Sequence, residues 1–174
     1  MPPTIIKVIE EPLKLLGEHA VECVIIGGVA ATLYGSTILT NDLDVCYARN
    51  PQNLERLATA LQSVHAKLRN APPDLPFILD AETLRRGLNF TFATDVGSLD
   101  LLGEVRGVGF YEEAVSGAIM YELFGYSFPV LEIKKLIVAK STAGRAKDIV
   151  VLPELEAIRE RELQDLTEQV KEDA

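Results

Sequence analysis

This sequence has few cysteines, no long hydrophobic run and no excess of positive charge. Its two cysteines, Cys23 and Cys46, lie within apolar segments, so we expect buried, reduced thiols rather than a disulfide framework. The longest apolar runs, such as residues 21–26, are too short to cross a bilayer. The N-terminal residues show no basic region followed by an apolar core, so no secretory signal is expected. These absences predict a cytoplasmic protein with no membrane partner.

The charge balance is acidic, with 26 Asp and Glu residues against 17 Lys and Arg residues and a formal net charge of −9. This balance gives no general attraction for nucleic acid, although a local basic groove stays open as an alternative. Much of the acidic excess lies between residues 154 and 173, so the rest of the chain is closer to neutral. The two histidines, His19 and His65, stand alone in helical segments and do not predict a zinc site. Nucleic acid is therefore an open but unfavoured partner.

The length of 174 residues, with 48% hydrophobic and 25% charged residues, is typical of one globular domain. Such a chain buries roughly two thirds of the surface that its unfolded form exposes. No internal repeat, low-complexity stretch or linker divides it. We predict a single domain over 1–174, with an N-terminal helix at 1–20, a catalytic-type core at 21–130 and C-terminal helices at 131–174.

The spacing of apolar residues predicts alternating helices and strands. Asn50 and Asp80 are expected to cap helices, whereas Pro12 should kink or divide the first helix and Pro153 should break the last one. Hairpins accompany one strand-helix-strand unit, which predicts an α+β (mixed α/β) fold: a small mixed sheet flanked by helices, with a helical C-terminal segment. Helices are expected at 5–18, 29–34, 51–68, 81–86, 110–115, 131–141 and 147–171, and strands at 21–26, 41–47, 88–94, 98–102, 119–123 and 126–130.

Two carboxylates, Asp42 and Asp44, lie one residue apart in the expected strand 41–47. Alternate residues of a strand share a face, so both acids should point the same way while Leu43 and Val45 enter the core. Like charges this close raise each other's pKa unless a cation lies between them. Oxygen ligands of this kind favour Mg²⁺, Mn²⁺ or Ca²⁺. The pair thus predicts a metal site, with two solvent-facing strand residues as the alternative.

A third acid, Asp100, lies among leucines in the expected strand 98–102. Burying an unpaired carboxylate costs on the order of several kcal/mol, and a metal shared with Asp42 and Asp44 would offset that cost. A turn cap or an arginine partner is the alternative for Asp100. Upstream, Gly27 and Gly28 stand between a strand and a helix, where free backbone N–H groups can face an anion. Metal beside phosphate is the chemistry that this combination indicates.

These residues carry a resemblance to a known family. The run from Gly27–Gly28 through Asp42-Leu43-Asp44, with Asp100 later, resembles the nucleotidyltransferase superfamily that includes DNA polymerase β. The lysine-rich segment 134–140 and the following Gly-Arg-Ala-Lys-Asp at 144–148 are similar to the compact bacterial AbiEii/MenT-like branch. The resemblance spans about residues 21–155. It implies a mixed sheet flanked by helices, with the Asp pair on one strand and the third Asp on its neighbour.

The resemblance also implies a reaction and its residues. A nucleoside monophosphate would move from an NTP to an acceptor (RNA, protein or small molecule) with release of pyrophosphate. The three acids would hold two Mg²⁺ ions, or Mn²⁺, and Asp100 would accept the proton of the attacking hydroxyl. Phosphate contacts would come from Gly27, Gly28, Ser36, Thr37 and Lys140, the lysine being alternatively part of a solvated helix face.

Two positions depart from the family pattern G-x-x-R-x-T-x-D-x-D. Ile38 stands at the arginine position and Asn41 replaces another frequent basic residue, whereas Thr40 is retained. The missing charge could come from elsewhere in the chain, with Arg49, Arg85 and Arg106 as candidates. The second hypothesis is therefore a catalytically degenerate binding or regulatory protein of this fold, with a second copy or an antitoxin as partner. A metal-dependent phosphohydrolase is a third class.

Overall fold

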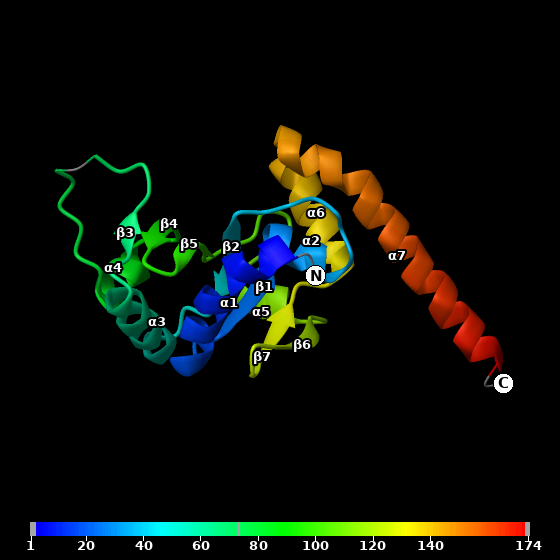
Figure 1. Ribbon diagram of the computed structural model, residues 1–174, viewed down its shortest axis with the longest axis horizontal. Coiled ribbons are helices and arrows are strands. Elements are labelled where there is room, and N and C mark those ends of the chain that lie inside the picture. Colours follow the sequence, from blue (N-terminus) through cyan, green and yellow to red (C-terminus); the bar gives the residue numbers. More distant parts are fainter. Residues whose placement is uncertain (1–2, 73, 173–174) are drawn as a thin grey trace.

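The computed structural model describes residues 3–72 and 74–172, which form a mixed sheet with helices around it (Figure 1). The strands are β1 Cys23–Ile26, β2 Asp42–Tyr47, β3 Lys67–Leu68, β4 Asn89–Thr94, β5 Gly97–Leu102, β6 Ile119–Leu123 and β7 Tyr126–Val130. The helices are α1 Pro3–Glu18, α2 Gly27–Leu33, α3 Pro51–Ser63, α4 Ala81–Arg86, α5 Tyr111–Val115, α6 Ile133–Ala143 and α7 Ala146–Glu172. This architecture confirms the mixed α/β fold with a helical C-terminal segment.

Within the described residues the strands form one sheet in the order β3-β4-β5-β2-β1-β7-β6. The expected hairpins are present, because β4 pairs antiparallel with β5 and β6 pairs antiparallel with β7. The centre is built differently: β2 runs antiparallel to β1 and parallel to β5. The parallel pair joins segments that are far apart in the sequence, and it places Asp44 directly opposite Asp100.

The core follows the predicted alternation along β2. Leu43 and Val45 are fully buried, whereas Asp42 and Asp44 between and beside them keep partial exposure. On α1, Ile9, Leu13 and Leu16 are fully buried, and this helix contacts β2 and β5. Asn50 and Asp80 cap α3 and α4 as predicted, each accepting a hydrogen bond from the backbone N–H three residues later.

The prolines do not divide their helices as predicted. Pro12 lies inside α1 and Pro153 inside α7, and both helices are continuous in secondary structure. An interior proline costs about 3 kcal/mol because it removes a backbone hydrogen bond and crowds the preceding turn. The buried side chains on each side of the proline, such as Leu13 in α1 and Leu155 in α7, offset this cost through packing.

The expected helix 51–68 is too long. The chain leaves α3 at Ser63, and His65 adopts a left-handed backbone with φ of 48°. This turn redirects the chain, so that Leu68 joins β3 and pairs with Phe92 of β4 instead of continuing the helix.

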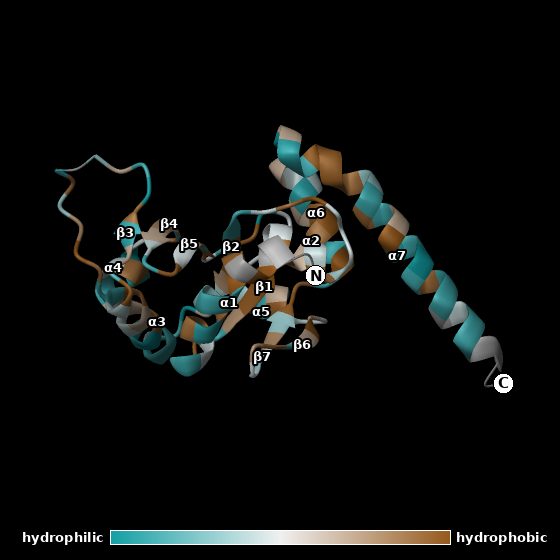
Figure 2. Cartoon of the chain, in the orientation of Figure 1, coloured by the Kyte–Doolittle hydropathy of each residue, from teal (hydrophilic) through white to brown (hydrophobic). Residues whose placement is uncertain are grey.

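The C-terminal part of α7 extends away from the sheet (Figure 1) and is mostly hydrophilic there (Figure 2). The first part of the same helix is packed, because Val151, Leu155 and Ile158 are buried. Among the described residues, none of the helices combines the length and the apolar character that crossing a membrane requires. The assignment of residues 1–174 to one domain stays a prediction.

Candidate active site

Three carboxylates meet where β2 and β5 lie side by side. Asp42 and Asp44 share one face of β2, and the parallel register sets Asp100 of β5 opposite Asp44. One carboxylate oxygen from each residue lies within 4.8 Å of the other two. The structure therefore brings together the three acids that the sequence places on neighbouring strands, while their catalytic and metal-binding roles stay predictions.

Burial and mutual repulsion make this cluster electrostatically costly. Burial raises the pKa of Asp44 to about 7, with further contributions from the negative charges of Asp42 and Asp100. Burial also raises the pKa of Asp100, although Arg69 opposes that shift. A carboxylate that holds its proton this strongly lacks sufficient positive charge around it. A cation beside these carboxylates would relieve their mutual repulsion.

Arg69 is the residue of this site that sequence reasoning missed. Its guanidinium forms an ion pair with Asp100, and its Nη1 lies 3.8 Å from Asp42 Oδ2. The backbone N–H of Arg69 donates to Thr91 O at 2.8 Å, which fixes the residue beside β4. No local signal marks it, because its contact with the acids depends on the β3–β4 pairing and position 69 directly follows the segment expected to be helical.

The three arginines proposed from the sequence behave differently from one another. Arg49 donates to Tyr47 Oη at 2.6 Å and to Arg85 O at 2.8 Å, so it is engaged away from the acids. Arg85 pairs with Glu82 within α4. Only Arg106 of these three borders the cavity beside the acids.

Gly27 and Gly28 open α2 rather than preceding it, and both allow close approach to the site. A Cβ on Gly27 would lie 2.1 Å from Asp44 Oδ2, and Gly27 has a left-handed φ of 66°. A Cβ on Gly28 would lie 2.6 Å from Thr40 Cβ. In turn, Thr40 Oγ1 donates to Asp42 Oδ1 at 2.9 Å. Residues without side chains at 27 and 28 thus leave room for the carboxylates and for Thr40.

Asp42 and Asp44 border a cavity of about 680 Å³, a size typical of small-molecule sites. The glycine pair lines it as well, whereas Asp100 is not among the lining residues and forms an ion pair with Arg69. The lining also includes four cationic residues, Arg106, Lys140, Arg145 and Lys147. One cavity therefore presents both negative charge suited to a metal and positive charge suited to phosphate.

The cationic side of the cavity is ordered by a buried carboxylate, Asp148. Lys140 Nζ donates to Asp148 Oδ1 at 2.9 Å, and Arg145 Nε donates to Oδ2 at 2.5 Å. Burial acts to raise the pKa of Asp148, but the hydrogen bonds from Arg145 and Lys140 outweigh it and hold that pKa below its ordinary value. Asp148 thus stays ionised and fixes both cations at the cavity. Sequence reasoning had placed Lys140 here as a phosphate contact, and that role stays a prediction.

Ser36 and Thr37 are not among the residues that line this cavity. Ser36 Oγ donates to Glu154 Oε2 at 2.6 Å, and the Thr37 N–H and Oγ1 donate to Glu154 Oε1 at 2.8 and 2.9 Å. Their donors therefore face α7, whereas the sequence had predicted that they face phosphate. The neighbouring Ile38 and Leu39 line the cavity in their place.

The donor set fits a divalent cation. Three carboxylates supply the hard oxygen ligands that Mg²⁺ and Mn²⁺ prefer. The pKa of Asp44 is raised first by burial and then by the charges of Asp42 and Asp100, and a cation beside these oxygens would oppose that shift. The residues present could therefore hold a metal ion at the wall of the cavity.

No family model matches the sequence. The search of curated proteins found no match either. Two solved structures resemble the chain in fold. One is a candidate nucleotidyltransferase from Thermotoga maritima, with a TM-score of 0.54, 16% identity, and coverage of 88% of this chain and 93% of that one. The other is the lincosamide antibiotic adenylyltransferase LnuA with lincomycin bound, with a TM-score of 0.58, 14% identity, and coverage of 87% and 96%.

Each likeness extends over most of this chain and nearly the whole of the solved structure. The narrower resemblance to the AbiEii/MenT-like branch stays a prediction. At the level of the fold, the chain therefore resembles these two structures.

Proposed function

We propose that this protein is a divalent-metal-dependent nucleotidyltransferase, which moves a nucleoside monophosphate from an NTP to an acceptor and releases pyrophosphate. The observation that carries the proposal is the convergence of Asp42, Asp44 and Asp100, whose ligand oxygens lie within 4.8 Å of one another beside the cavity. The same cavity is lined by cations, so a triphosphate and a metal would each meet opposite charge there. The fold likeness to nucleotidyltransferases supports this assignment.

The proposal gives each group of residues a distinct task. The three aspartates would hold Mg²⁺ or Mn²⁺, which supplies Lewis-acid stabilisation of the triphosphate and lowers the pKa of the attacking hydroxyl. Lys140 and Arg145, already oriented by Asp148, would contact phosphate oxygens. Asp100 is the candidate acceptor of the hydroxyl proton, and Arg69 is the charge partner that keeps it oriented.

For the acceptor, we propose a small molecule as the first class to test. LnuA, which shares the fold, is named as a lincosamide adenylyltransferase. The net charge of −9 gives no general attraction for RNA. An antitoxin partner remains a prediction from the sequence resemblance, and a second copy of the chain remains a prediction from the apolar N-terminal segment.

Binding can be tested before the acceptor is known. At least one of the four NTPs, with Mg²⁺ or Mn²⁺, should raise the melting temperature of the wild-type protein, because a ligand at 100 times its Kd stabilises the folded state by about 2.7 kcal/mol. Asp42→Asn should abolish this shift by removing a metal ligand. The exposed Asp165→Asn is the matched control and should retain it. No shift with any NTP and either metal would contradict the proposal.

Turnover separates the enzyme from the second candidate, a degenerate nucleotide-binding protein. Two observations favour that second candidate: Ile38 lines the cavity where the family pattern has arginine, and Asp100 is engaged by Arg69. Labelled NTP incubated with small-molecule extract should yield a labelled product and pyrophosphate if the protein is a transferase. Release of inorganic phosphate instead would indicate a phosphohydrolase, and binding without any product would favour the degenerate protein.

A further inference from the structure

Glu154 of α7 holds the cavity loop, defined here as residues 36–41, by three hydrogen bonds. Its Oε2 accepts from Ser36 Oγ, and its Oε1 accepts from both the N–H and the hydroxyl of Thr37, at 2.6 to 2.9 Å. These hydrogen bonds, that of Ser36 first, keep the pKa of Glu154 below its ordinary value, so the carboxylate is charged at neutral pH. The contact joins segments more than 100 residues apart in the sequence.

The other end of the cavity loop is tied to a site acid. Thr40 Oγ1 donates to Asp42 Oδ1 at 2.9 Å, and Thr40 packs against Gly28 so closely that a Cβ there would overlap it. Between these two attachments, Ile38 and Leu39 line the cavity and remain 36% and 62% exposed. The middle of the loop therefore owes its position to its two ends.

Glu154 is itself held firmly. It lies between Val151 and Leu155, both buried, on the packed first part of α7. Asp148, one turn before Val151, is fully buried and binds Lys140 and Arg145 of the same cavity. The helix thus contacts the cavity at two places: through Asp148 to the cations and through Glu154 to the loop.

We infer that Glu154 is a positioning residue for the nucleotide site, which clamps the cavity loop so that Thr40 orients Asp42 and Ile38 and Leu39 form one wall. This inference rests on the proposed function and extends it to a residue that touches neither metal nor nucleotide. An alternative is that Glu154 occupies the place of a substrate phosphate by binding Ser36 and Thr37. These two residues do not line the cavity, which favours the clamp over that alternative.

If Glu154 clamps the loop, its removal should weaken nucleotide binding. When only a fraction of molecules has the competent loop conformation, the apparent Kd rises by the inverse of that fraction. Glu154→Ala should therefore weaken binding of the NTP that stabilises the wild type, with Mn²⁺ present, by about tenfold in calorimetric titration. Glu156→Ala, an exposed glutamate two residues along α7, is the control and should bind like the wild type. Glu154→Gln keeps one acceptor oxygen and should fall between the two.

A double-mutant cycle tests whether Glu154 acts through the loop. Thr37→Val removes the hydroxyl donor to Glu154, so the effects of Thr37→Val and Glu154→Ala on Kd should be clearly less than additive. A merely structural role for Glu154 would lower the melting temperature and leave Kd unchanged well below it. Unchanged affinity, or fully additive effects, would overturn the inference. Tighter binding by Glu154→Ala would also overturn it, because it would mean that Glu154 competes with the nucleotide.

The loop can also be followed without any ligand. In Glu154→Ala, the amides of residues 36–41 should exchange hydrogen at least about tenfold faster than in the wild type, while those of β2 stay protected. Equal exchange in both proteins would overturn the clamp. Failure of the wild type to bind any NTP would instead contradict the proposed function, and the exchange measurement would still decide whether Glu154 holds the loop.

Discussion

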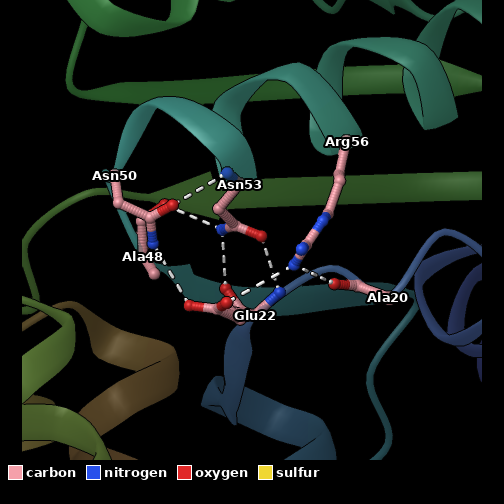
Figure 3. Close-up of polar contacts among 6 residues, drawn as sticks. All are labelled: Ala20, Glu22, Ala48, Asn50, Asn53 and Arg56. Carbon is pink, nitrogen blue, oxygen red and sulfur yellow. Dashed lines mark hydrogen bonds and ion pairs between the residues drawn. The ribbon is translucent and has the colours of Figure 1, made fainter.

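The two ends of the β1–β2 pair differ in how completely their polar side chains are matched by partners. At the end where Glu22 and Ala48 lie, Asn53 of α3 is fully buried and fully hydrogen-bonded (Figure 3). Its Nδ2 donates to Glu22 O at 2.9 Å and to Ala48 O at 2.8 Å, and its Oδ1 accepts from Glu22 N at 2.7 Å. At the other end Asp44 pairs with Ile26 in the strand register and faces two further carboxylates.

This contrast suggests that one end of the strand pair contributes to stability and the other to the proposed function. The Asn53 end satisfies its own donors and acceptors, so it ties α3 to the sheet and needs nothing from outside. The Asp44 end leaves negative charge incompletely matched, with Arg69 as its one ion-pair partner within hydrogen-bonding reach in the described residues. In the proposed function, a divalent metal would supply the positive charge that this end lacks. Mutations at the two ends should therefore have effects of different kinds.

The largest effect is expected from Gly27→Ala. The new Cβ would overlap Asp44 Oδ2, and residue 27 would also keep a left-handed φ that alanine tolerates poorly. Displacing a reacting-site group by about 1 Å costs roughly 100-fold in rate, so pyrophosphate release should fall at least that far. Gly125→Ala is the control, because it shares a positive φ but has open space around its Cβ. Similar activity in both variants would show that Asp44 does not need its present position.

The next effect concerns the Asn53 end. Asn53→Ala removes the hydrogen bonds of its amide to Glu22 N, Glu22 O and Ala48 O, of which Glu22 O still accepts from Ala48 N, so the free energy of unfolding should fall by about 2 kcal/mol. Urea titration of the variant measures this loss. Kd for metal and nucleotide should stay unchanged at temperatures where the protein is folded. A loss below about 0.5 kcal/mol would mean that water replaces the amide at this end of the strands.

Asp44→Asn should stabilise the protein without metal, whereas Asn53→Ala destabilises it. Removing a buried charge whose pKa is raised to about 7 should increase the free energy of unfolding without metal by about 1 kcal/mol at pH 8, while stabilisation by Mn²⁺ is lost. Asp148→Asn is the opposite case, since that carboxylate has two cationic partners and its removal should destabilise. Thermal unfolding of both variants with and without Mn²⁺ measures the change in stability and the stabilisation by the metal. Destabilisation by Asp44→Asn without metal would contradict the view that the negative charge of Asp44 lacks a sufficient cationic partner.

The smallest effect is expected from Asn50→Ala. Asn50 caps α3 through its contact with Asn53 N and donates to Glu22 Oε2 at 3.1 Å (Figure 3). Loss of an N-cap costs about 1 kcal/mol, less than loss of the buried Asn53 amide. Urea titrations of the two variants side by side should give this order. The reverse order would indicate that the cap, and not the buried amide, holds α3 to the sheet.

Local patterns were sufficient for much of the fold and for identifying the three acids, whereas their placement on neighbouring strands came from the family resemblance. The Asn50 and Asp80 caps, the hairpins and the alternation along β2 are properties of adjacent residues, and Asp100 was recognisable by its leucine neighbours. Contacts between distant segments were not predictable in this way. Arg69 reaches the acids through strand pairing, and Glu154 engages Ser36 and Thr37 from the C-terminal helix.

The predicted division of helices at the prolines failed for a related reason. Local chemistry opposes an interior proline, but α1 and α7 are stabilised by side chains that pack against other elements. The end of α3 was misplaced because apolar spacing continued to Leu68 past the left-handed turn at His65. Both the continuity of α1 and α7 and the end of α3 are therefore set by tertiary structure and not by the local pattern.

The parallel pairing of β2 with β5 has a consequence for how the protein folds. Asp44 and Asp100 belong to strands separated by more than 50 residues of sequence, including α3, β3, α4 and β4. Contacts of such long sequence separation form late, after the cost of closing the intervening loop has been met. The complete set of acids therefore exists only in chains whose central sheet is assembled. A metal ion added during refolding would accelerate no early step, but it would trap the finished sheet and slow its unfolding.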